Sequence, residues 1–382
     1  MLERVPSPRP RTPLPHRVPV SAKGERAFPP PLAGSVRTVP FRSRVLRDNP
    51  LGDPVVRQEV VYTPPSGETR GKPLLVYLAG FLGAGWNTFV TGQPFGESLV
   101  QRVDRLMRHR ECPEAVLLAP DCLTTLGGSQ YVNSPATGRY EDHVMDELLP
   151  WARAKYGTGP VALFGQSSGG FGALHLALQR PGALEAVGSS AGDMSFEYCY
   201  LPEFPRAIRH LRSAGGVDRF LRGLLATPPT SLSPSMGFAA ALDVVAMSSC
   251  YSPVEEEPGA FELPFDPGSG AIRPEVWERW MTFDPCRRLR VEKDVQAFRR
   301  LRLLLLNASG QDEWGLDVAA FRFAEEAKRR GLSAEYREYP GGHFDKGPRL
   351  EDLVRRLAQT LAGEEGRPSR SRRTRPRAGE SS

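Results

Sequence analysis

The chain has 382 residues, of which 40% are hydrophobic and 25% are charged, and its formal net charge is +6. This length can bury one sizeable core, and the apolar content is ordinary for a soluble globular protein. The basic excess lies at the ends, because residues 1–27 carry a net charge of +4 and residues 364–382 one of +3. The remaining −1 gives no support for a nucleic-acid-binding protein.

Both ends are rich in Pro and Arg and hold too little apolar surface to fold. We therefore predict a disordered leader over 1–34, one folded domain over 35–362 and a disordered basic tail over 363–382. The alternative for the tail is contact between Arg367–Arg377 and a polyanion.

Targeting and metal signals are missing from the sequence. The first residues have no apolar core of a signal peptide, and the first hundred contain no membrane-length stretch. The five cysteines are scattered, with no Cys-x-x-Cys. No His/Cys/Asp cluster has metal-ligand spacing. We expect a cytoplasmic protein with reduced thiols, no membrane contact, no metal and no cofactor.

Eight strand-like runs predict strands, and after the third they alternate with helical patterns. The first two lie close together, which favours an antiparallel start, and the rest predict right-handed crossovers in a mostly parallel sheet with helices on both faces. The predicted strands cover 35–47, 55–63, 74–79, 115–119, 160–164, 184–189, 302–307 and 333–339.

The fifth predicted strand ends in Gly165-Gln-Ser167-Ser-Gly169, and a helical pattern follows at once. Strand, tight turn and helix form the setting of a nucleophile elbow, in which small neighbours let the serine adopt a strained conformation. We predict Ser167 as the nucleophile. The backbone N–H of Ser168 begins the helix and can stabilise an oxyanion.

A second match to the same pentapeptide occurs at Gly188–Gly192, which contains Ser189 and Ser190. The residues after it, from Asp193 onwards, have no clean helical stripe. We interpret Ser189 and Ser190 as the end of the sixth strand and prefer Ser167 to Ser190 as the nucleophile.

The general base is predicted to be His343, which follows a strand and lies in Pro340-Gly-Gly-His-Phe-Asp345. Glycines on a loop after a strand free an imidazole to reach into a cleft. The alternative is an ordinary turn histidine. The other histidines are interpreted as solvated or packed surface residues, and they are His16, His109, His143, His175 and His210. His143 is placed on a charged helix face.

The acid partner of the base is predicted to be Asp312, just past the seventh strand, where open α/β sheets place their sites. Asp317 precedes an evident helix and is interpreted as its N-cap. Glu313 and Asp345 are further alternatives. The resulting chain order Ser–Asp–His is the order of the α/β-hydrolases.

A second oxyanion donor is expected in Gly80–Gly85, the glycine-rich loop after the third strand. By position we assign it to the backbone N–H of Phe81, beside that of Ser168. A phosphate-binding loop would be the alternative, but neither a P-loop nor a dinucleotide fingerprint is present. Tyr131 and Asn133, on a loop before a helix, are weaker candidates for lining the cleft.

These features together resemble the putative-esterase branch of the α/β-hydrolases, which includes esterase D (S-formylglutathione hydrolase), the enterochelin esterases and the mycolyltransferases. The resemblance covers about residues 35–362. It rests on four segments, Tyr140–Pro150, Gly165–Leu174, Gly310–Asp312 and Gly341–His343.

The resemblance implies an α/β-hydrolase fold with Ser167 as nucleophile, Asp312 as acid and His343 as base. It also implies an oxyanion hole made by the N–H groups of Phe81 and Ser168. Many relatives have His-Gly after the third strand where this chain has Ala79-Gly80. The hydrogen bonding of this loop and its fit to a substrate can therefore differ.

More than a hundred residues separate the sixth and seventh strands, too many for a simple crossover. We predict an insertion at 194–285 and propose that it acts as a lid, with Trp277 and Trp280 touching the acyl group. The alternative is a structural appendage or a dimer contact.

The sequence therefore predicts a serine carboxylic-ester hydrolase that acts on a small-molecule ester through an acyl-enzyme. One alternative is an acyltransferase of the same fold. Another is a non-catalytic family member that binds carbohydrate or protein.

Overall fold

A computed structural model describes residues 31–89, 97–227 and 235–363. The predicted leader and tail lie outside these residues, except for 31–34 and 363. The elements below all belong to one compact unit that begins at Leu32.

The centre of this unit is an eight-stranded sheet in the order β1-β2-β4-β3-β7-β8-β9-β10. β1 pairs with β2 and β2 with β4 in antiparallel fashion, and every other pairing is parallel. All eight predicted strands, the antiparallel start and the mostly parallel sheet are confirmed. The strands are β1 Ser35–Arg42, β2 Val56–Thr63, β3 Leu74–Leu78, β4 Val116–Ala119, β7 Val161–Gln166, β8 Ala186–Ser190, β9 Leu303–Ser309 and β10 Ala334–Tyr339. A separate small ribbon pairs β5 Asn133–Ser134 with β6 Gly138–Arg139.

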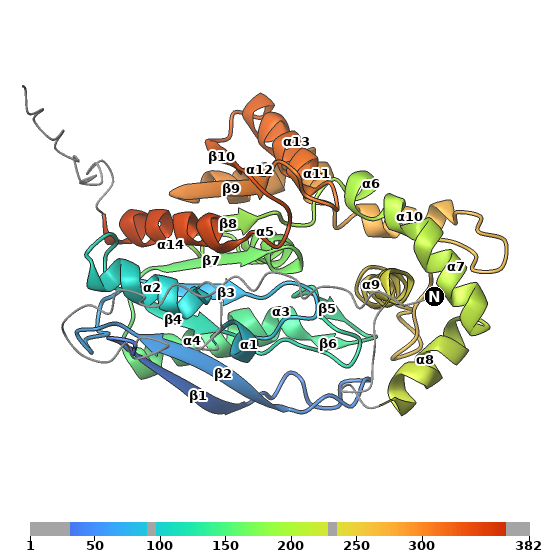
Figure 1. Ribbon diagram of the computed structural model, residues 1–382, viewed down its shortest axis with the longest axis horizontal. Coiled ribbons are helices and arrows are strands. Elements are labelled where there is room, and N and C mark those ends of the chain that lie inside the picture. The colour runs from blue at the N-terminus through green and yellow to red at the C-terminus, as the bar shows by residue number, and fades with distance from the viewer. Residues whose placement is uncertain (1–30, 90–96, 228–234, 364–382) are drawn as a thin grey trace, which may run out of the picture. The chain divides into compact units, whose positions relative to one another are not determined.

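Helices cover both faces of the sheet, which explains why its central strands are continuously apolar (Figure 1). On β7, Phe164 faces the side covered by α2 and α14, whereas Leu163 faces the side covered by α5 and α13. The helices outside the long β8–β9 connection are α1 Gly85–Thr88, α2 Leu99–Arg108, α3 Tyr140–Asp142, the π-helix η1 His143–Leu148, α4 Leu149–Tyr156, α5 Ser168–Gln179, α13 Leu316–Arg329 and α14 Gly347–Ala362.

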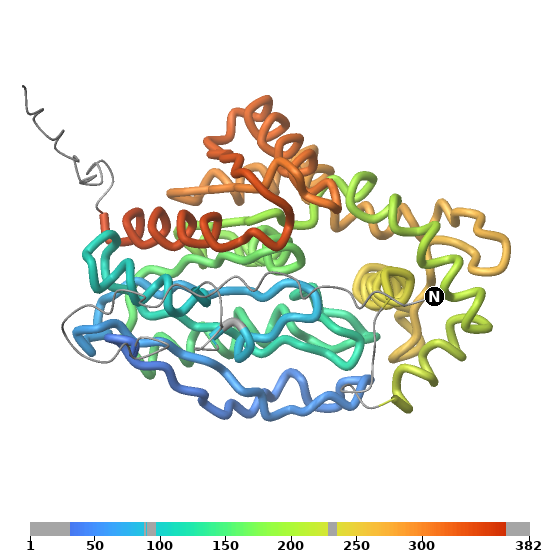
Figure 2. Tube along the Cα trace, in the orientation of Figure 1, coloured from blue at the N-terminus to red at the C-terminus, as the bar shows by residue number. Residues whose placement is uncertain are grey.

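The connection between β8 and β9 is helical, and Figure 2 shows its path. Residues 204–226 form two helices and not one, because Gly215 and Gly216 have φ values of 85° and 102° and separate them. The elements are α6 Phe196–Cys199, the 3₁₀ turn η2 Leu201–Glu203, α7 Phe204–Ala214, α8 Val217–Ala226, α9 Met236–Tyr251, α10 Pro274–Met281, α11 Pro285–Arg288 and α12 Glu292–Arg299.

The insertion contributes an aromatic cluster, centred on Trp280, that is continuous with the core on one face of the sheet. This side chain is completely buried, and its Nε1 donates to Ser252 Oγ at 2.9 Å. Its ring packs against those of Tyr200, Tyr251 and Trp277 at centroid distances of 5.4, 5.4 and 5.9 Å.

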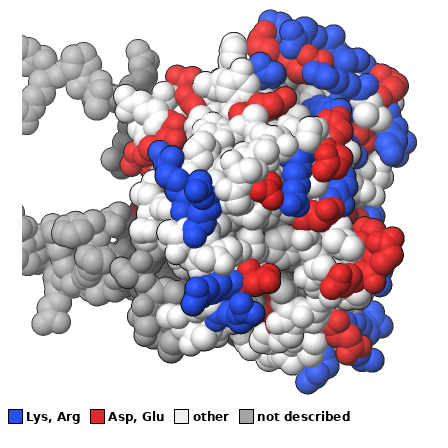
Figure 3. All heavy atoms as spheres, turned by 90° about the vertical axis from the view of Figure 1, so that its right-hand side faces the viewer, with Lys and Arg blue, Asp and Glu red and all other residues white. Residues whose placement is uncertain are grey.

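Acidic and basic side chains are interspersed on the surface that faces the viewer in Figure 3, as expected for a nearly neutral folded domain.

His143 is not on an exposed helix face, so this prediction was wrong. It is completely buried in η1 between two carboxylates, with Nε2 3.5 Å from Glu59 Oε1 and Nδ1 3.4 Å from Glu147 Oε2. Burial acts to lower the pKa of His143, but its contacts with the two carboxylates outweigh it and raise the pKa. His175, also interpreted as a surface residue, is buried and stacks on Phe171.

Candidate active site

Ser167 occupies the turn between β7 and α5 with φ 55° and ψ −128°, a conformation that is strained for any residue with a side chain. The turn is possible because its flanks are glycine. A Cβ on Gly169 would lie 1.9 Å from the carbonyl oxygen of Leu78, and one on Gly165 would lie 2.4 Å from the backbone of Gly169. The local geometry is therefore that of a nucleophile elbow.

His343 and Asp312 are in direct contact. Nδ1 of His343 lies 2.8 Å from Oδ2 of Asp312, and both residues are buried. The second carboxylate oxygen, Oδ1, accepts the N–H groups of Trp314 at 3.0 Å and Leu316 at 3.4 Å. The Trp314 ring packs edge-on against the imidazole of His343, with 4.9 Å between the ring centroids. The carboxylate and the imidazole are thus both fixed in orientation.

The three alternative acids lie elsewhere. Glu313 accepts the backbone N–H of His343, and Asp345 accepts that of Gly342, both at 2.8 Å. Asp317 was predicted to be the N-cap of α13, and this prediction was wrong. The N-cap is Gly315, with φ 68°, and Asp317 lies in the first turn of the helix. Glycine adopts this left-handed φ without the steric cost that a Cβ would add.

Ser167 and His343 line the same open cleft, which has a volume of about 920 Å³. The cleft lies between the loop after β3, the start of α2 and the loop that leads from β10 into α14. Among the described residues, none from 194–285 lines it. Neither Trp277 nor Trp280 lines the cleft, and Trp280 is completely buried, so their positions do not support the hypothesis that they contact the acyl group.

The loop after β3 passes directly beside the elbow. A Cβ on Gly80 would lie 3.3 Å from the Cβ of Ser167, and Phe81 lines the cleft. Within residues 31–89, 97–227 and 235–363, no hydrogen bond uses the Phe81 N–H, whereas the next N–H, of Leu82, donates to Gly127. The Phe81 N–H is thus available to a ligand. Tyr131 supports this loop from behind, since its hydroxyl donates to the Ala79 carbonyl at 2.7 Å.

Neither Tyr131 nor Asn133 lines the cleft, which corrects their prediction as lining residues. Tyr131 is buried, and the side-chain amide of Asn133 donates to Asp142 at 2.9 Å. Both are therefore structural.

Sequence reasoning missed Asp193, whose Oδ1 lies 3.5 Å from Ser167 Oγ. Its other oxygen accepts hydrogen bonds from Ser168 Oγ at 3.1 Å, Tyr200 at 2.9 Å and Gln130 at 3.2 Å. Burial raises the pKa of Asp193. The sequence feature that could have indicated Asp193 was its place directly after the second Gly-x-Ser-x-Gly, at the end of a strand beside β7.

Ser190 ends that strand as predicted, and its carbonyl accepts the N–H of Ser167 at 3.0 Å.

The sheet order, the helices on both faces and the elbow after β7 define an α/β-hydrolase fold. The sequence pattern of the family described as "Putative esterase" matches residues 127–347. The chain belongs to this family of esterases.

Two solved structures illustrate the likeness. A ferulic acid esterase is 17% identical with a TM-score of 0.52, and the match covers 87% of this chain and 100% of that one. The S-formylglutathione hydrolase of Agrobacterium tumefaciens is 15% identical with a TM-score of 0.52, covering 87% and 97%. At these identities the likeness establishes the fold. No curated protein sequence matches the chain. None of the described helices has both the length and the apolarity needed to span a bilayer.

Proposed function

We propose that the protein is a serine carboxylic-ester hydrolase that uses Ser167, His343 and Asp312. One observation carries the proposal. Ser167, in a strained elbow, lines the same cleft as His343, whose Nδ1 contacts the buried carboxylate of Asp312. Membership of an esterase family supports the same reaction class.

In this mechanism Ser167 attacks the ester carbonyl while Nε2 of His343 removes its proton. Asp312, 2.8 Å from Nδ1, holds the imidazole in the required tautomer and stabilises the imidazolium that forms. The N–H groups of Phe81 and Ser168 bind the tetrahedral oxyanion. His343 then protonates the leaving alcohol, and an activated water hydrolyses the acyl-enzyme.

The substrate in this proposal is a small-molecule ester, which is supported by the family and by the open cleft. If an alcohol replaced water in the second step, the same residues would perform acyl transfer. We also propose a cytoplasmic location, supported by the odd number and scattered spacing of the cysteines.

The test is covalent labelling by a small fluorophosphonate, combined with hydrolysis of p-nitrophenyl esters of different acyl lengths. Ser167→Ala should abolish labelling and reduce kcat by about 10⁴- to 10⁶-fold. Ser190→Ala is the matched control, because this serine is buried one strand away and contributes only its backbone carbonyl to the elbow. It should retain most of both signals. A Ser167→Ala protein with normal turnover, or a wild type that is never labelled, would refute the proposal, and the latter would favour a binding protein.

A further inference from the structure

The backbone carbonyl of His343 is held by two side chains from different parts of the fold. Nε2 of Gln166 donates to it at 3.1 Å, and Nη2 of Arg349 donates to it at 2.5 Å. Both donors are buried, Arg349 completely. Gln166 is the residue immediately before Ser167, so one hydrogen bond joins the elbow directly to the loop that carries the proposed base.

Arg349 is in an unusual environment for an arginine. Its Nε and Nη1 have no hydrogen-bond partner among the described residues, although the side chain has no exposed surface. Burying a guanidinium is costly unless its donors are satisfied, so such a group needs an explanation. The one hydrogen bond that its guanidinium makes within the described part of the chain is to His343.

The loop around His343 needs support because of where it starts. β10 is the edge strand, and β8 and β9 separate it from β7. With neighbouring strands about 4.8 Å apart, the loop must bring His343 across roughly 14 Å to reach the elbow. It contains Gly341, with φ 100°, and Gly342, which are conformationally permissive. Asp345 and Glu313 hold the N–H groups of Gly342 and His343, and the carbonyl of His343 is held by Gln166 and Arg349.

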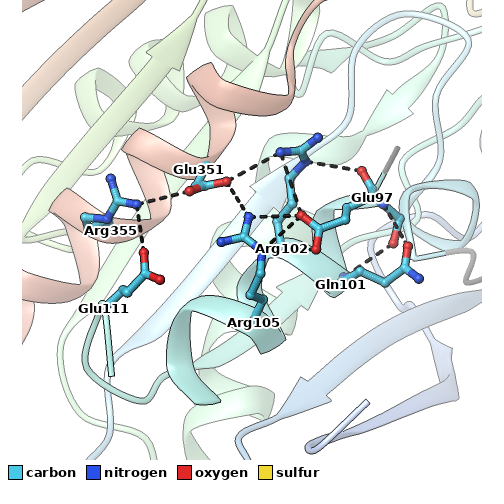
Figure 4. A network of polar contacts seen from close by, with 8 residues as sticks. Glu97, Gln101, Arg102, Arg105, Glu111, Glu351 and Arg355 are labelled. Carbon is cyan, nitrogen blue, oxygen red and sulfur yellow. Dashed lines mark hydrogen bonds and ion pairs between the residues drawn. The ribbon is translucent and has the colours of Figure 1, made fainter. Parts of the chain in front are cut away.

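The helix that carries Arg349 is itself fixed in place. Glu351, one half-turn further along α14, forms ion pairs with Arg102 at 3.4 Å and Arg105 at 2.7 Å on α2 (Figure 4). On its other side, the amide of Asn307 in β9 donates to the backbone carbonyl of Arg349 at 2.9 Å. Arg349 is therefore a rigid anchor for the loop.

We propose that Gln166 and Arg349 are positioning residues that set the place of the His343 imidazole relative to Ser167. This inference rests on the proposed function of the Ser–His–Asp site. Both residues hold the backbone of His343; Gln166 also lines the cleft, and the charge of Arg349 also interacts with the Asp312 carboxylate. Displacing a catalytic group by about 1 Å typically lowers the rate by about 100-fold, so loss of these hydrogen bonds should lower kcat and leave KM nearly unchanged.

The test compares Arg349→Met, Arg349→Lys and Gln166→Met with Arg57→Met. Arg57 is a matched control, because it is also buried, also donates to a backbone carbonyl (Leu123, 2.8 Å) and also has an unpartnered Nε, but Leu123 does not line the cleft, whereas His343 does. Arg349→Met should lower kcat by about 100-fold and Gln166→Met by about 10-fold. Arg349→Lys, which keeps the charge and a donor, should recover part of the loss. The double variant should lose less than the product of the two, since both side chains hold one carbonyl.

A second readout does not depend on turnover. The Nδ1 proton of His343, identified in the ¹H NMR spectrum by its loss in His343→Gln, should exchange faster with solvent in Arg349→Met than in Arg57→Met. Equal kcat values for these two variants, or an unchanged exchange rate, would overturn the inference. If the wild type neither hydrolyses esters nor reacts with a fluorophosphonate, the proposed function fails, and the exchange rate alone decides the positioning role. If Arg349→Met does not fold, Gln166→Met and Arg349→Lys provide the same comparison.

Discussion

Three buried histidines contact carboxylates among the described residues, and the surroundings of two of them, His343 and His143, differ. His343 lies 2.8 Å from Asp312 at the ends of parallel strands and lines an open cleft beside Ser167. His143 lies between Glu59 and Glu147, does not line that cleft and has no exposed surface. The same pair of chemical groups is therefore open to a ligand at the strand ends that border the cleft, and is enclosed by packing at the helix that holds His143.

The largest expected effect breaks the contact at the cleft. Asp312→Asn presents the wrong hydrogen-bonding group to Nδ1 of His343 and should lower kcat by about 10⁴-fold with little change in melting temperature. The matched control is Asp317→Asn, five residues along, whose side chain lies in the first turn of α13. It should remain within a few-fold of the wild type in ester hydrolysis. An inactive Asp317→Asn protein would mean that the acid is misassigned.

A substitution of Trp280 in the insertion tests whether the aromatic cluster contributes to stability and not to substrate binding. Trp280→Ala removes a completely buried ring and its hydrogen bond to Ser252, and should lower the free energy of unfolding by about 3–5 kcal/mol. Because Trp280 does not line the cleft, kcat/KM should change by the same factor for short and long acyl esters, measured well below the melting temperature. A loss confined to long acyl chains would restore the lid hypothesis.

The smallest effect concerns the second histidine site. Glu147 accepts hydrogen bonds from Ser43 Oγ at 2.6 Å and the Arg44 N–H at 2.9 Å and lies 3.4 Å from His143. Burial acts to raise its pKa, but these hydrogen bonds outweigh it and lower the pKa to about 2. Glu147→Gln should therefore reduce the free energy of unfolding at pH 7 by about 1–3 kcal/mol without changing kcat.

The pH dependence of that difference gives a sharper test. A carboxylate whose pKa is lower in the folded state stabilises the fold fully above its ordinary pKa of 4.5. This contribution is lost as the pH falls from 4.5 towards 2. Urea unfolding of wild type and Glu147→Gln at pH 7, 5 and 3 should show the difference shrinking below pH 5. A difference that stays constant would show that the hydrogen bonds do not depend on the carboxylate's charge.

The sequence alone determined the strands, because a sheet covered on both faces requires continuous apolar runs at β3, β4, β7 and β9. It also determined the elbow at Ser167, since the required glycines and the strand–helix pattern are local. The predicted place of Asp312 and His343, each just after a strand, followed from the rule that sites form at strand ends.

Tertiary structure alone decided what contacts these residues from a distance. Asp193 contacts Ser167 across 26 residues of sequence and Gln166 contacts His343 across 177, and no local pattern encodes such a contact. The burial of His143 and Trp280 was also missed. The sequence around His143 predicts a charged helix face whether that face is exposed or buried, and the same holds for the aromatic residues around Trp280. Burial cannot be predicted there, because it is set by the packing of segments far apart in the chain.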